Sequence, residues 1–153
     1  MQKNQKNLLI IDDEGSITKG LHELLNEIAD KIFIASNGQE ALDLLKKHPI
    51  HCIVSDIMMP QMDGVQLIKK VRESNNNVPF IFYTGIGNQE LMLEASKYGA
   101  FDFLNKPNLI GLEECVARGL QTGIGEDPAA QANHDENISE YKKLLEQISK
   151  KKS

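Results

Sequence analysis

The sequence predicts an α/β protein, a doubly wound five-stranded parallel sheet with helices on both faces. Two observations predict this fold. Short apolar runs of strand length alternate with segments whose apolar residues recur at helical spacing, from residue 7 to about residue 121. The runs at residues 8–11 and 52–54 are apolar along their whole length, as in strands that are covered on both faces. Right-handed crossovers between parallel strands then place helices over both faces of the sheet.

The first half of this pattern contains two strands and two helices. Residues 8–11 form the first expected strand, and apolar residues recur at helical spacing between 17 and 28. Residues 31–35 form the second expected strand. The next helix begins at Asn37, which is followed three residues later by a glutamate, the spacing of a capping box. It ends before Pro49, since the residue preceding a proline is pushed out of the helical region.

The third and fourth strands each end on a polar residue. Residues 52–54 form the third strand, and Asp56 follows it. A proline and an Asp-Gly pair then interrupt the chain before a helical pattern begins at Val65. The fourth strand lies within residues 78–84 and ends on Thr84. A glycine-containing turn leads from it into the fourth helix.

The fifth strand and helix complete the repeat. The fourth helix extends to about Tyr98, and residues 102–105 form a short fifth strand that is followed by Lys106 and Pro107. The last helix of the repeat lies near residues 109–120. We therefore assign residues 7–121 to one domain and residues 122–153 to a linker with a possible amphipathic helix, whose apolar stripe is Ile138, Tyr141, Leu144, Leu145 and Ile148.

Composition narrows the class of protein. The formal net charge of −5 disfavours a nucleic-acid-binding surface, which needs clustered lysine and arginine. No apolar run approaches the roughly 20 residues of a membrane span, and the first seven residues are too polar for a signal peptide. We therefore expect a cytoplasmic protein. Cys52 and Cys115 lack the spacing of a zinc or redox motif, so they are expected to be buried, reduced thiols.

Polar residues follow four of the five strands, and all of them meet at the carboxyl edge of a parallel sheet, where such folds bind ligands. They are Asp12, Asp13, Asp56, Thr84 and Lys106. Any one of them alone is more simply a helix cap or turn residue. Their recurrence at successive strand ends favours a site.

The chemistry of this set points to a divalent cation and a phosphoryl group. Three carboxylates brought together repel one another unless a cation compensates, and oxygen ligands suit Mg²⁺. Zinc is disfavoured because no histidine or cysteine lies near. Lys106 can pair with a phosphoryl oxygen and Thr84 can donate a hydrogen bond to one. Asp56 can then act as a nucleophile that forms an aspartyl-phosphate.

This combination of an acidic pair, the stretch 53–64, Thr84 and Lys106-Pro107 resembles the receiver domain of bacterial two-component response regulators, over residues 7 to about 121. The resemblance implies a flavodoxin-like fold with strand order 2-1-3-4-5. It also implies that Asp56 accepts a phosphoryl group from the histidine of a sensor kinase or phosphotransfer protein.

The resemblance implies further roles at the site. Asp13 and Asp56 bind Mg²⁺ together with the backbone carbonyl of Met58, and Asp12 assists through water. Thr84 and Lys106 hold the phosphoryl group, and the peptide bond between Lys106 and Pro107 is cis, an isomer that is accessible at modest cost only before proline.

Phe103 and the tail depart from what is common in the family. Thr84 and Phe103 are the expected switch residues, but Phe103 lacks the hydroxyl of the tyrosine found in many relatives. No DNA-binding or enzymatic module follows the domain in this sequence. We therefore expect a single-domain regulator, not an enzyme, whose output is contact with an unidentified downstream protein. The face of the fourth and fifth helices is the expected surface for a homodimer.

Three alternatives stay open beside this interpretation. A phosphohydrolase of the haloacid dehalogenase type would share the nucleophile and the cation, but it needs an aspartate where this chain has Met58. A flavin carrier needs a phosphate-binding loop after the first strand, where three acidic residues would repel phosphate. The chain could also be a receiver cut from a longer protein, or a scaffold that acts through its tail.

Overall fold

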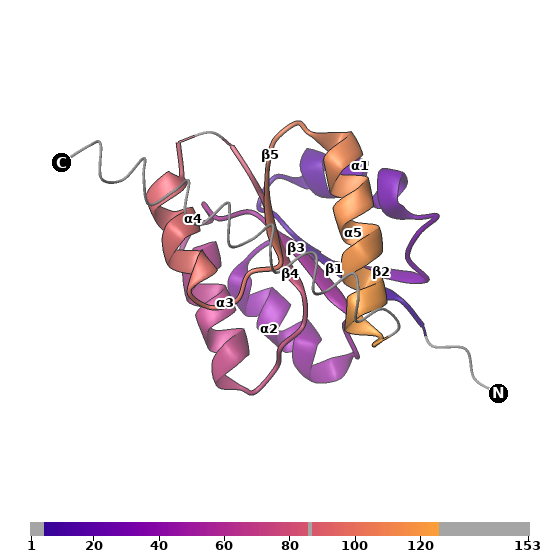
Figure 1. Ribbon diagram of the computed structural model, residues 1–153, viewed down its shortest axis with the longest axis horizontal. Coiled ribbons are helices and arrows are strands. Elements are labelled where there is room, and N and C mark those ends of the chain that lie inside the picture. Colours follow the sequence, from indigo (N-terminus) through magenta and orange to yellow (C-terminus); the bar gives the residue numbers. More distant parts are fainter. Residues whose placement is uncertain (1–4, 86, 126–153) are drawn as a thin grey trace.

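The computed structural model describes residues 5–85 and 87–125, and these form a five-stranded parallel sheet flanked by helices (Figure 1). The strand order is β2-β1-β3-β4-β5, which confirms the expected fold class and topology. The elements are β1 (Asn7–Ile11), α1 (Gly15–Leu25), β2 (Lys31–Ala35), α2 (Gly38–Lys47), β3 (Cys52–Ser55), α3 (Gly64–Glu73), β4 (Phe80–Thr84), α4 (Gln89–Ser96), β5 (Asp102–Asn105) and α5 (Leu109–Gly123).

The register of the sheet brings the ends of the central strands level. Ile11, the last residue of β1, pairs with Ser55, the last residue of β3. Thr84 at the end of β4 pairs with Asn105 at the end of β5. Since all neighbouring strands are parallel, the residues that follow β1, β3 and β5 emerge at one edge of the sheet, beside the last residue of β4.

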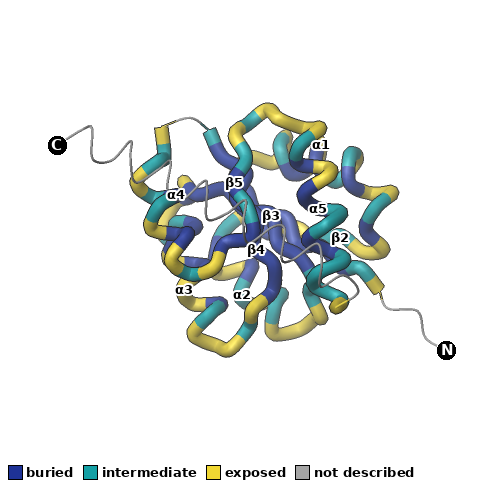
Figure 2. The backbone as a smooth tube through the Cα atoms, in the orientation of Figure 1, coloured by how far each residue is buried: buried dark blue, intermediate teal, exposed yellow. Residues whose placement is uncertain are grey.

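Two apolar cores cover the two faces of the sheet, and the strands β3 and β4 between them are dark blue, the colour of buried residues, in Figure 2. On one face, alternate strand residues such as Leu9 and Phe82 pack against α2, α3 and α4. On the other face, residues such as Ile10 and Tyr83 pack against α1 and α5. The central strands β1, β3 and β4 are buried along their whole length, which agrees with their continuous apolar sequences. Three buried central strands therefore support the edge where the polar residues lie.

The helix starts agree only partly with the sequence patterns. Asn37 caps α2 by accepting a hydrogen bond from the Glu40 amide, as predicted, but the Glu40 carboxylate accepts from Ser36 instead of closing a capping box on Asn37. The complete capping box belongs to α3, where Asp63 and Gln66 bond each other's backbone amides. The Asp-Gly pair in this sequence is thus a helix start as well as a chain break.

The remaining predictions concern the tail, the cysteines and the membrane. The predicted amphipathic stripe beyond Gly125 lies outside the described residues. Cys52 and Cys115 are free and buried, as predicted, and burial raises the pKa of both thiols above the ordinary value. No helix within the described part of the chain is both long and apolar enough to cross a membrane.

Candidate functional site

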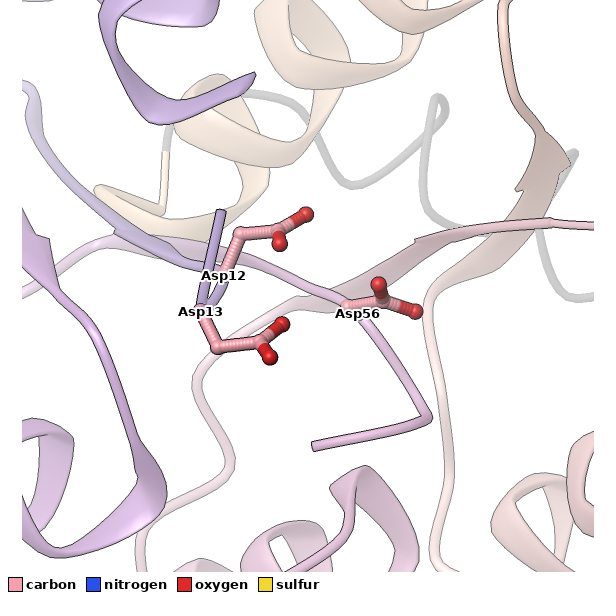
Figure 3. A group of neighbouring side chains, drawn as sticks. All are labelled: Asp12, Asp13 and Asp56. Atoms are coloured by element: carbon pink, nitrogen blue, oxygen red, sulfur yellow. The ribbon is translucent and has the colours of Figure 1, made fainter. Parts of the chain in front are cut away.

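Three carboxylates gather at the carboxyl edge of the sheet (Figure 3). Asp12 and Asp13 follow β1, and Asp56 follows the neighbouring strand β3. One carboxylate oxygen from each residue lies within 4.8 Å of the others. Asp12 is 3% exposed and Asp56 is 9% exposed, whereas Asp13 is exposed to solvent. The cluster is therefore anchored in the protein on one side and open to solvent on the other.

Lys106, which follows β5, bridges two of these carboxylates. Its Nζ donates to Asp12 Oδ2 at 2.8 Å and to Asp56 Oδ2 at 3.0 Å. Burial alone lowers the pKa of the Lys106 ammonium, but the hydrogen bonds to the two carboxylates outweigh it and raise the pKa above its ordinary value. The Lys106–Pro107 peptide bond is cis, as the resemblance implies. Lys106 thus keeps its charge and places it directly over the carboxylates.

Asp12 is held by the backbone as well as by Lys106. Its Oδ1 accepts a hydrogen bond from the Glu14 amide at 3.0 Å. Burial raises the pKa of the Asp12 carboxyl, while Lys106 and the Glu14 amide act in the opposite direction. The negative charge of Asp12 is consequently costly in this position and depends on nearby positive charge.

Three hydrogen-bond donors to one carboxylate oxygen orient the Asp56 side chain. Its Oδ1 accepts hydrogen bonds from the Thr84 hydroxyl at 2.7 Å, the Ile57 amide at 2.7 Å and the Met58 amide at 3.3 Å. Its Oδ2 accepts from Lys106 alone among the hydrogen bonds found in the described residues. The donors fix the side chain in one orientation and leave Oδ2 less occupied for a new bond.

Gly64 allows the loop after Asp56 to fold back tightly. A Cβ at this position would lie 2.7 Å from the Asp56 carbonyl oxygen, 2.7 Å from a Phe82 ring carbon and 2.9 Å from the Ile57 Cα. The Gly64 amide donates to the Ile57 carbonyl at 2.7 Å. The start of α3 therefore touches the backbone that carries the candidate nucleophile, and only glycine fits there.

Thr84 is fully buried and has a second partner that the sequence patterns did not reveal. Its Oγ1, which donates to Asp56, also accepts a hydrogen bond from Asn88 Nδ2 at 2.9 Å. In the sequence, Asn88 lies in the glycine-containing turn before the fourth helix. An asparagine directly before a helix is a usual N-cap signal, and that signal gives no indication of this contact.

The other predicted residues flank the site. Phe103 is 4% exposed and stacks on Phe82, with ring centroids 5.5 Å apart. The Met58 side chain is 55% exposed, and the structure connects this residue to Asp56 through its amide. Lys106 Nζ also lies 5.9 Å from the centroid of the Tyr83 ring, a contact that the sequence did not predict.

The donor set fits a hard divalent cation. Carboxylate oxygens are the ligands that Mg²⁺ prefers, and the edge of the cluster that faces solvent leaves room for the waters that this ion retains. Three carboxylates against one lysine also leave an excess of negative charge at the site. Asp12, Asp13 and Asp56 are therefore the residues that would hold the ion, directly or through water.

Comparison with known proteins agrees with this geometry. The profile of the response regulator receiver domain family matches residues 8–117. The transcriptional regulatory protein FixJ of Bradyrhizobium diazoefficiens is 35% identical over 128 residues, which are 81% of this chain and 62% of FixJ. The response regulator Rre1 of Synechocystis is 33% identical over 147 residues, or 92% of this chain and 64% of Rre1. The chain thus spans less than two thirds of the length of these relatives.

Solved structures give the same result. The receiver domain of a Francisella response regulator is similar with a TM-score of 0.69 and 30% identity, and the match covers 78% of this chain and 98% of that one. Full-length FixJ from B. japonicum matches with a TM-score of 0.72 and 30% identity, over 84% of this chain and 63% of FixJ. The acidic pocket, the paired lysine and these matches converge, and the chain belongs to the response regulator receiver domain family.

Proposed function

We propose that Asp56 accepts a phosphoryl group from the phosphohistidine of a sensor kinase or a phosphotransfer protein. The observation that carries this proposal is the environment of its carboxylate, in which Thr84 and two backbone amides orient Oδ1 while Oδ2 faces Lys106. A new bond forms between an Asp56 oxygen and phosphorus as the bond from phosphorus to the histidine nitrogen breaks. The product is an aspartyl-phosphate.

The surrounding residues have separate tasks in this reaction. Lys106 replaces its hydrogen bond to Asp56 by one to an oxygen of the incoming phosphoryl group. The Thr84 hydroxyl donates a hydrogen bond to a second phosphoryl oxygen. Asp13, Asp56 and the Met58 carbonyl would hold Mg²⁺, with Asp12 acting through water, and the ion would supply positive charge for the phosphoryl oxygens. Because phosphoryl transfer depends mainly on positioning and charge stabilisation, these groups suffice for chemistry at Asp56.

The proposal includes how the signal leaves the site. Phosphorylation adds about −1.5 to −2 charges and three acceptor oxygens, which draw the Thr84 hydroxyl toward the phosphoryl group. Thr84 and Phe103 are the proposed switch residues, and in this structure the Phe103 ring is already turned inward against Phe82. The output is contact with a protein partner in the cytoplasm, with no direct binding of nucleic acid and no enzymatic activity. The α4 and α5 face is the proposed surface for a homodimer.

The structure does not favour the haloacid dehalogenase alternative. That chemistry needs an acid or base two residues after the nucleophile, and the side chain there is the exposed thioether of Met58, which cannot transfer protons.

Intact-mass measurement after incubation with acetyl phosphate and Mg²⁺ tests the proposal. The parent chain should gain one phosphoryl group, and Asp56→Asn should gain none. Asp43→Asn, which changes an aspartate on α2 away from the site, is the matched control and should be modified like the parent. Modification of Asp56→Asn to the parent level would overturn the assignment of the phosphoacceptor.

A further inference from the structure

Asn88 immediately precedes α4, but its side chain does not cap that helix. Asparagine at this position usually accepts a hydrogen bond from an amide of the first helical turn. Here the side chain instead turns back toward the end of β4. Its Nδ2 donates to Thr84 Oγ1 at 2.9 Å and lies 3.3 Å from the Gly85 carbonyl oxygen.

The direction of these hydrogen bonds follows from what each group can donate. The Gly85 carbonyl can only accept, so the Asn88 atom that faces it must be the NH₂ group. The Thr84 hydroxyl has one proton, which it directs to Asp56 Oδ1 at 2.7 Å. Its contact with Asn88 must therefore be one in which Thr84 accepts. The two partners of the amide independently require the same orientation of the Asn88 side chain.

We propose that Asn88 is a positioning residue for the phosphoryl transfer proposed above. By donating to a lone pair of Thr84 Oγ1, it holds the hydroxyl so that its single proton points at Asp56 before phosphorylation and at a phosphoryl oxygen after it. This inference rests on the proposed function of Asp56. Asn88 touches neither the nucleophile nor the phosphoryl group, and it acts only through the buried Thr84 hydroxyl.

Asn88→Asp reverses the polarity of this contact with almost no change in shape. A carboxylate only accepts, so the Thr84 hydroxyl loses the donor that fixes it, and the new carboxylate competes with Asp56 for its single proton. Aspartate is as good an N-cap as asparagine and suits the positive end of a helix, so α4 is expected to stay intact. Asn88→Ala removes the donor without offering a new acceptor and leaves the hydroxyl free to rotate.

The initial rate of modification by acetyl phosphate is the first measurement. In this reaction an Asp56 oxygen bonds to phosphorus as the bond from phosphorus to the acetyl oxygen breaks, and acetate leaves. We expect Asn88→Asp to lower the rate at saturating donor roughly tenfold and Asn88→Ala roughly threefold, the range set by one hydrogen bond. Gln89→Glu places the same charge one residue further along α4 and should leave the rate within about twofold of the parent.

A double-mutant cycle separates the hydroxyl from simple charge repulsion. In a Thr84→Val background there is no hydroxyl to orient, so Asn88→Asp should have no further effect. A loss of the same size in that background would show that the new carboxylate acts on Asp56 through space, and would overturn the inference. A parent-like rate for Asn88→Asp in the presence of Thr84 would overturn it as well.

NMR of the unphosphorylated chain tells failure of this inference from failure of the proposed function. The side-chain amide signals of Asn88 should shift on Thr84→Val and should keep their positions on Thr84→Ser, which retains the acceptor. Asn88 side-chain amide signals that do not shift on Thr84→Val would overturn the inference even if Asp56 is phosphorylated. A parent chain that is never phosphorylated would overturn the proposed function and the role of Asn88 in it, whatever the amide signals show.

Discussion

Asp13 is expected to lower the stability of the metal-free chain and to be required for its stabilisation by Mg²⁺. Its carboxylate lies within 4.8 Å of those of Asp12 and Asp56, whereas the hydrogen bonds of Lys106 found in the described residues go to those two and not to Asp13. Asp13→Asn removes the charge and keeps the shape. The variant should therefore gain stability without metal and lose its response to metal.

The expected sizes follow from the geometry of the cluster. Two unit charges about 4 Å apart interact by about 1 kcal/mol in water. Since Asp13 is exposed, solvent screening keeps its repulsion with the other carboxylates near this value for water. We therefore expect Asn at position 13 to raise the free energy of unfolding by up to about 1 kcal/mol in chelator. In the parent, Mg²⁺ at a hundred times its dissociation constant should add about 2.7 kcal/mol.

Thermal unfolding in chelator and in increasing MgCl₂ measures both effects. Glu14→Gln is the matched control, because Glu14 is an exposed carboxylate next in the chain that is not part of the cluster. The control should keep the full Mg²⁺ response. The reasoning fails if Asp13→Asn responds to Mg²⁺ as the parent does, or if the variant is less stable than the parent in chelator.

Two further predictions concern the scaffold. Arg72→Met should lower the free energy of unfolding by about 3 kcal/mol, measured by urea unfolding, and exposed Lys70→Met should change it by less than 0.5 kcal/mol. The reason is that Arg72 donates to four backbone carbonyls at 2.8–3.1 Å, those of Asn76, Val78, Tyr98 and Gly99. A loss below about 1 kcal/mol would contradict the prediction and would show that water replaces Arg72 at these carbonyls. Burial lowers the pKa of His51, whose Nδ1 accepts a hydrogen bond from the Asn7 amide. His51 therefore binds a proton more readily in the unfolded chain than in the folded one. Stability should therefore fall as the pH drops below about 6.5, and His51→Gln should flatten this slope between about pH 7 and 5.5; an unchanged slope would exclude His51 as its source.

The site could be predicted because its residues sit at fixed places in a regular pattern. Asp12, Asp56 and Lys106 each follow a strand, and parallel strands bring such residues to one edge whatever the order of the strands. The order itself did not follow from the apolar pattern. It came from the resemblance to receiver domains, and the observed order β2-β1-β3-β4-β5 confirmed it.

The interactions that were missed depend on the orientation of single side chains. Asparagine before a helix and arginine on a helix ordinarily read as an N-cap and as a solvated charge. In the structure, Asn88 turns away from α4 toward Thr84, and Arg72 folds over the start of β4 and the end of α4 to donate to four carbonyls. Neither orientation has a spacing signature. Asn88 turns back to a strand end only four residues earlier, whereas Arg72 reaches Tyr98 and Gly99, which are 26 and 27 residues away in the sequence.

The charges at the site predict that phosphorylation needs both the cation and the lysine. Three carboxylates against one ammonium leave two uncompensated negative charges, which a single divalent ion neutralises. Conversion of Asp56 to its phosphate replaces one negative charge by about two at neutral pH. With the ion bound, the product state therefore carries about one excess negative charge, and without it about three, in a pocket where Asp12 is already costly to ionise. Phosphorylation without the ion should accordingly be strongly disfavoured, and Lys106 alone cannot replace it.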